Sequence, residues 1–153
     1  MKVIGQGLDG RYPEVFELEK IEQWDYKDFV NLIDFIEERW AYAESGYFSK
    51  EWTKDDIHGR DELTVNMSTA GWSGNESIIE SLLKNRLFCI CWYYSWRRGG
   101  HYVFKINPYN AGFKRVSEVA KEKGVSRQKI HRAKDNYDWI VAGKRTRLCR
   151  SKV

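Results

Sequence analysis

The stretch that most constrains the fold is Val116–Lys134, which reads VSEVAKEKGVSRQKIHRAK. Its pattern predicts a helix, a tight turn and a second helix. Ser117 and Ser126 are typical N-cap residues, and Gly124 supplies the positive φ at which the first helix can end. In the second helix, Ile130 and Ala133 point back toward the first helix, and the polar side chains between them cover the other faces.

The outward face of this second helix is almost entirely basic. Its members, with the capping residue before them, are Ser126, Arg127, Gln128, Lys129, His131 and Arg132. Arg pairs bidentately with guanine and Gln with adenine, and Lys or Arg neutralises phosphates. These residue types predict contact with double-stranded DNA. The alternative is a plain helical hairpin whose basic face is only solvated.

A basic hairpin is predicted after the two helices. Trp139–Val141 and Thr146–Leu148 flank a turn, with Lys144, Arg145 and Arg147 at or beside its tip. The spacing of Ala120, Gly124 and Ile130 resembles the helix-turn-helix family. With the hairpin, the segment resembles a winged helix-turn-helix module of the excisionase or MerR-like sort. That resemblance implies that the second helix lies in the major groove and that the hairpin touches the DNA backbone.

The charge of the chain is divided along its length. The net charge is +4, but residues 112–153 hold 13 Lys and Arg against 4 Asp and Glu, whereas residues 1–111 hold 13 against 18. A basic segment following an acidic body is typical of a nucleic-acid contact surface, and equally of a tail that docks on an acidic protein.

The body before this segment alternates strand and helix patterns. The expected elements are a short strand within Glu14–Glu22, a helix over Tyr26–Ala43 capped by Asp25, strands Tyr47–Trp52 and Leu63–Ser68, a helix capped by Ser73 and ended by Asn85, a strand buried on both faces at Leu87–Trp96, and a returning strand His101–Ile106. We therefore expect an α+β fold in two parts. A small antiparallel sheet with two packed helices spans 1–111, and a C-terminal winged helix-turn-helix spans 112–153, with Asn107–Gly112 as the linker.

Two stretches of the body form a second hypothesis. GWSGNESIIESL and WRRGGHYVFKI, between Gly71 and Ile106, resemble a motif pair in small, uncharacterised proteins of tailed bacteriophages. The resemblance implies a phage context and no particular activity. If the two stretches lie together, a helix N-terminus and basic side chains would suit an anion. The residues of that anion-binding hypothesis are Ser73, Gly74, Asn75, Arg97, Arg98 and His101.

Other function classes find little support in the residues. Gly71–Asn75 superficially resembles a nucleophile elbow but lacks the partners of a triad, so no catalytic residue is assigned and the protein is expected not to be an enzyme. The glycine-rich GQGLDG near the N-terminus does not follow a convincing strand and predicts a loop. Three cysteines without suitably spaced histidines predict reduced core thiols and neither a metal nor a cofactor.

The sequence therefore predicts a phage-type, non-catalytic DNA-binding protein. With no apolar run long enough for a membrane and no signal-peptide pattern, the expected location is the cytoplasm, that of the host bacterium for a phage protein. A homodimer is reasonable, because one short module gives little affinity alone. One alternative is an anti-defence inhibitor that binds a host protein. The other is a small phosphate- or nucleotide-binding protein or enzyme that uses the Gly71–Glu76 turn and the Arg97–His101 hairpin.

Overall fold

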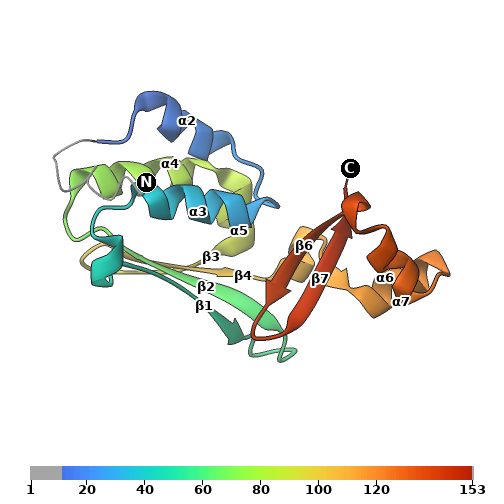
Figure 1. Ribbon diagram of the computed structural model, residues 1–153. Coiled ribbons are helices and arrows are strands. Elements are labelled where there is room, and N and C mark those ends of the chain that lie inside the picture. Colours follow the sequence, from blue (N-terminus) through green and yellow to red (C-terminus); the bar gives the residue numbers. More distant parts are fainter. Residues whose placement is uncertain (1–11, 153) are drawn as a thin grey trace. The chain divides into compact units, whose positions relative to one another are not determined.

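The computed structural model describes residues 12–152, in which the chain forms two compact units (Figure 1). Within the described part, the first unit comprises residues 12–51 and Thr64–Ile106, and the second comprises Trp52–Leu63 and residues 107–152. The second unit thus includes twelve residues from the middle of the chain as well as its C-terminal part. The predicted GQGLDG loop lies outside the described residues.

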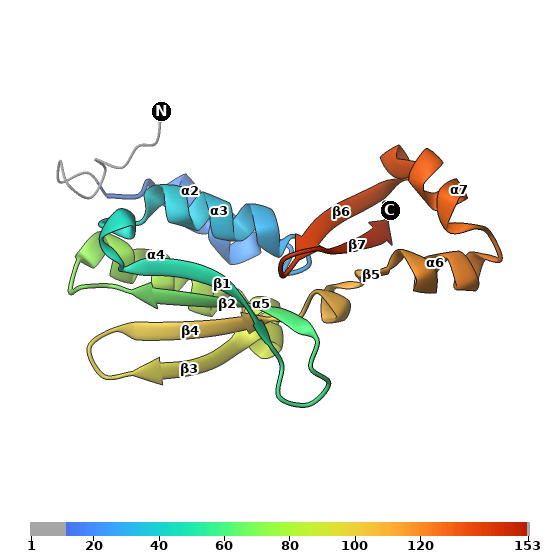
Figure 2. The ribbon, with the colours of Figure 1, turned by 60° about the horizontal axis from the view of Figure 1, so that its bottom comes forward.

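Strands and helices alternate in the first unit. Its elements are α2 (Val15–Gln23), α3 (Phe29–Arg39), η1 (Ala43–Ser45), β1 (Phe48–Lys54), β2 (Asp61–Ser68), α4 (Ser73–Lys84), α5 (Arg86–Trp92), β3 (Tyr93–Arg97) and β4 (His101–Ile106), where β1 and β2 continue into the second unit. The strands form one sheet in the order β1-β2-β4-β3. Helices α3 and α4 lie over one face of this sheet, and β3 forms an outer edge (Figures 1 and 2).

The core of the first unit lies between the helices and that sheet face. Phe29, Leu32 and Ile36 recur along α3 at helical spacing and are fully buried. Phe104 and Ile106, two residues apart on β4, are also fully buried, so alternate residues of this strand face the helices. His101, Val103 and Lys105 therefore face the opposite side of the sheet.

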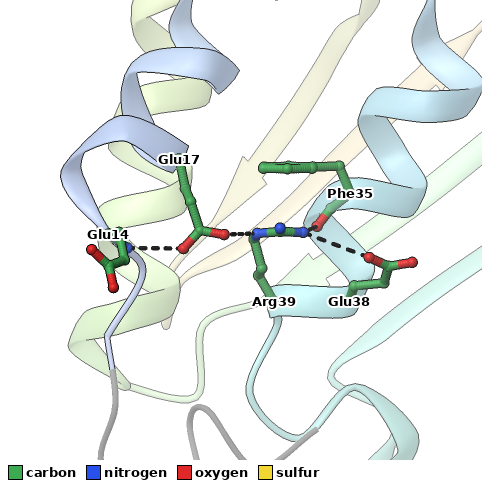
Figure 3. Close-up of polar contacts among 5 residues, drawn as sticks. All are labelled: Glu14, Glu17, Phe35, Glu38 and Arg39. Atoms are coloured by element: carbon green, nitrogen blue, oxygen red, sulfur yellow. Dashed lines mark hydrogen bonds and ion pairs between the residues drawn. The ribbon is translucent and has the colours of Figure 1, made fainter. Parts of the chain in front are cut away.

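A partly buried ion pair connects α2 to α3 (Figure 3). The guanidinium of Arg39 pairs through Nε with the carboxylate of Glu17, which is 6% exposed. The other carboxylate oxygen of Glu17 accepts a hydrogen bond from the backbone N–H of Glu14 at 3.0 Å, and Arg39 donates to the carbonyl of Phe35 at 3.0 Å. Because both charged groups have these further partners, the pair holds the two helices in one register.

The prediction of a doubly buried strand at Leu87–Trp96 is wrong. The first half is helix α5 and the second half is the edge strand β3. Asn85 accounts for the helix: its side chain accepts from the backbone of Phe88 and donates to the carbonyls of Ile21 (3.0 Å) and Trp24 (2.8 Å). Helical spacing then buries Phe88 and Trp92, whereas Ile90 is 77% exposed.

Three other local expectations are corrected. Residues Val15–Gln23 form a helix in place of the short strand, and Ile21 is on its buried face. Ser73 is the first residue of α4 and does not cap it; the N-cap position is Trp72, and the Ser73 hydroxyl donates to the Tyr12 hydroxyl at 3.1 Å. Helix α3 starts at Phe29, so it is shorter than the predicted Tyr26–Ala43. Strands β1, β2 and β4 and the end of α4 before Asn85 agree with the prediction.

The second unit combines two short helices with a small sheet. Its elements are η2 (Pro108–Ala111), β5 (Lys114–Arg115), α6 (Val116–Lys123), α7 (Arg127–Arg132), η3 (Lys134–Asn136), β6 (Tyr137–Ala142) and β7 (Thr146–Ser151), with the sheet order β5-β7-β6. The predicted linker is a 3-10 turn in which Pro108 and Ala111 are buried. With both sheets and the helices described, the α+β class is confirmed.

The predicted helix, turn and helix are present in the second unit. Gly124 ends α6 at φ 64°, and the Ser126 hydroxyl accepts from the Lys129 backbone N–H at 3.2 Å, so it caps α7. Ser117 lies inside α6, which has Arg115 at its N-cap position, so the predicted cap there is wrong. Among residues 12–152, every helix is too short or too polar to cross a membrane.

Candidate nucleic-acid interface

Helix α7 presents its basic residues to solvent because a single apolar residue anchors it. Ile130 is 1% exposed and packs in a cluster with Val119 and Ala120 of α6 and with Tyr137 and Cys149 of the hairpin. The predicted contact residues on and before the helix are all exposed: Ser126, Arg127, Gln128, Lys129, His131 and Arg132. One buried side chain thus orients all the others.

The position of Ile130 decides how far each side chain of α7 points outward. At about 100° per residue, Gln128 and Arg132 lie most nearly opposite Ile130. Arg127 and His131 fall on one flank of the helix, and Lys129 falls on the other. Gln128 and Arg132 are therefore on the side of α7 that faces away from the buried Ile130.

The hairpin extends the same surface beyond the helices. In the β6–β7 register, Trp139 is opposite Cys149 and Val141 is opposite Arg147, so these four side chains share one face. Cys149 and Trp139 pack against the helices, whereas Arg147 and Val141, which is 54% exposed, continue the face toward the turn. Lys144 and Arg145 lie exposed in that turn.

A groove of about 340 Å³ lies between α7 and the hairpin. The His131 ring stacks on the Trp139 ring, with centroids 5.5 Å apart and an interplanar angle of 17°. The Trp139 indole N–H donates to the Lys134 carbonyl at 2.9 Å, which fixes the ring. Arg147 and Val141 line the groove on the hairpin side. The structure therefore brings His131 and Arg147, sixteen residues apart, to one surface.

The cations on this surface differ from several other cations of the unit, which are paired with carboxylates. The side chains of Arg127, Lys129, Arg132, Lys144, Arg145 and Arg147 make no ion pair or hydrogen bond with any residue in the described part of the chain. By contrast, Lys54 pairs with Asp61 at 2.8 Å and Lys114 with Glu122 at 2.6 Å. Six unneutralised positive charges on α7 and the hairpin form an attractive surface for a polyanion.

Sequence reasoning missed part of this surface. Lys134 and Val141 line the groove but were not among the predicted contact residues, and Trp139, predicted only as part of a hairpin strand, lines it as well. Their place depends on the strand register, which brings the hairpin back onto α7. One indication of this arrangement is present in the sequence: Trp139 and Val141 are two residues apart and therefore share one face of β6.

The six residues of the anion-binding hypothesis have different environments. Asn75 is 1% exposed, accepts from the Ala41 N–H at 2.9 Å and donates to the carbonyls of Ala41 and Thr69, so its side chain supports the fold. Gly74 is buried against Trp72. Arg97 and His101 line a separate pocket with residues of β2, and Ser73 and Arg98 are exposed outside that pocket.

The described residues contain no group of three or more His, Cys, Asp or Glu arranged to hold a metal ion. The three cysteines are free thiols: Cys149 is buried, Cys89 is half-buried, and Cys91 is exposed and so lies outside the core where it was expected. No protein-family model matches the chain, and neither a curated protein nor a solved structure matches it.

Proposed function

We propose that the second unit binds double-stranded DNA through α7 and the β6–β7 hairpin, without catalysis. The observation that carries this proposal is the set of six exposed cations that have no partner in the described part of the chain. A side chain that is paired with a carboxylate gains little from a phosphate, because the phosphate must displace the first partner. An unpaired Arg or Lys is free to neutralise a phosphate and release its counterion.

The geometry supports separate roles for the two elements. Gln128 and Arg132 point most directly away from the unit, so they reach base edges when α7 enters a major groove. Arg127 and Lys129 flank them and meet the phosphates on either side. Lys144, Arg145 and Arg147 follow the hairpin and hold the backbone beside the groove, in the manner of a wing.

The stacked His131 and Trp139 rings support the same arrangement. The stacked rings line the groove between α7 and the hairpin, and their contact joins the two basic elements into one surface. The DNA backbone that runs from α7 toward the hairpin would contact Arg147, which lines the groove on the hairpin side. The resemblance to excisionase and MerR-like modules, and the phage and cytoplasmic setting expected from sequence, are compatible with this proposal.

Charge reversal on α7 tests the proposal. The double substitution Arg127→Glu and Arg132→Glu is expected to weaken duplex binding by at least about 100-fold, because two charge-assisted contacts are lost. Arg86→Glu with Arg98→Glu is the matched control, since both arginines are exposed in the first unit and the net charge changes equally. Equal loss in both variants, or retained binding in the α7 variant, would refute a DNA contact at α7.

A further inference from the structure

A second pocket, of about 380 Å³, lies in the first unit at the end of the four-stranded sheet. The side chains that define this sheet-end pocket are Tyr47, Asn66, Ser68, Arg97 and His101. His101 and Val103 lie on the sheet face opposite the buried Phe104, so the pocket opens on the face that the helices leave uncovered. Its volume falls within the range of about 300–1,000 Å³ usual for small-ligand sites.

Backbone hydrogen bonds hold the three segments of the pocket together. The Ser68 N–H donates to the Tyr47 carbonyl at 2.8 Å, which fixes the segment before β1 beside the end of β2. On the other side of β2, the Thr69 N–H donates to the Gly100 carbonyl at 3.0 Å. A Cβ at Gly100 would lie 2.3 Å from the Thr69 hydroxyl, so glycine permits this close approach. The pocket is therefore preformed by the fold.

Four polar side chains of the pocket are without partners among residues 12–152. In the described part of the chain, the side chains of Asn66, Ser68, Arg97 and His101 make no hydrogen bond or ion pair. Arg97 carries a permanent positive charge and His101 can carry one, and no Asp or Glu is among the described residues that line the pocket. The electrostatic preference of the pocket is therefore for an anion.

The remaining lining indicates more than a bare ion. Tyr47 offers an aromatic surface, and the Asn66 amide both donates and accepts hydrogen bonds. Arg97 is the last residue of β3, and its guanidinium can bind a phosphoryl group with two parallel hydrogen bonds. We propose that the sheet-end pocket binds a nucleoside monophosphate, with the phosphate on Arg97 and His101 and the base against Tyr47 and Asn66.

This inference is independent of duplex binding by the second unit. It keeps the Arg97–His101 half of the anion site expected from sequence and replaces the Gly71–Glu76 half by β2 and the segment before β1. Binding of the four ribonucleoside monophosphates to the full chain, followed by calorimetry, is the direct test. We expect saturable one-to-one binding of at least one of them, and weaker binding of inorganic phosphate and of the nucleoside alone.

Neighbouring arginines provide a matched pair of variants. Arg97, at the end of β3, lines the pocket and Arg98, the next residue, does not, although both are exposed. Arg97→Gln is expected to weaken nucleotide binding about 10-fold to 100-fold, while Arg98→Gln leaves it unchanged. Asn66→Ala should weaken the nucleotide more than inorganic phosphate, since it removes a contact to the base. Duplex binding should be unchanged in all three variants.

Several results would overturn the inference. They are the absence of saturable binding by any of the four nucleotides at millimolar concentration, equal effects of the Arg97 and Arg98 substitutions, and a nucleoside or inorganic phosphate that binds as tightly as the nucleotide. Circular dichroism of each variant shows whether the fold is retained. None of these outcomes depends on whether α7 binds DNA.

Discussion

The salt dependence of duplex binding follows directly from the unpaired cations. For B-form DNA, each neutralised phosphate contributes about 0.9 to the negative slope of log K against log salt. If the six unpaired side chains on α7 and the hairpin each neutralise one phosphate, the slope per bound protomer is about −5. Replacing Arg127 and Arg132 by Gln removes two contacts and should reduce its magnitude by about 2.

Fluorescence anisotropy of a labelled duplex across a series of KCl concentrations measures this slope. The matched control is Lys54→Gln with Lys114→Gln, which removes the same charge from the same unit. Both lysines are already paired with carboxylates, so few counterions should be released through them, and the slope should stay near that of the unaltered protein. A slope unchanged in the α7 variant, or equally reduced in the control, would contradict the assignment of these contacts.

Three further predictions concern the fold. Gly124→Ala should lower the free energy of unfolding in urea by about 1 kcal/mol, because φ is 64° and only the left-handed backbone conformation is costly there. Gly143→Ala should lower it more, since the added Cβ would also lie 2.7 Å from a carboxylate oxygen of Asp61. Equal costs for the two substitutions would contradict this reasoning. Asn75→Ala should cost about 2–3 kcal/mol, because buried backbone groups lose their partners, and a cost near zero would refute that role. In native protein, a thiol reagent should modify Cys91 first and Cys149 only after unfolding, because burial hides the Cys149 thiol and raises its pKa; equal rates would contradict this order.

Local signals made the helices of the second unit predictable. Ser126 and Gly124 mark the start of α7 and the end of α6 through their own backbone chemistry, and Ile130 identifies the inner face. The outward direction of the basic side chains follows from that one residue. Their lack of carboxylate partners does not follow from sequence, because pairing depends on which acidic residues the fold brings near.

The errors in the first unit have a physical cause in long-range contacts. The apolar run from Leu87 to Trp96 has no periodicity that separates helix from strand. Helix α5 begins at Asn85, whose side chain is held by the carbonyls of Ile21 and Trp24, more than sixty residues earlier. The sheet-end pocket could not be predicted from the sequence for the same reason, since Tyr47 and Arg97 line one pocket only because of the order of the strands.

Chemical-shift mapping of the isotope-labelled full chain with a short DNA duplex tests the central claim most directly. Amide shifts should concentrate at residues 126–132 and 144–147, and the Trp139 indole N–H should shift because Trp139 lines the same groove. Shifts confined to the first unit, or no shifts at low salt, would contradict the claim that α7 and the hairpin form a DNA-binding surface.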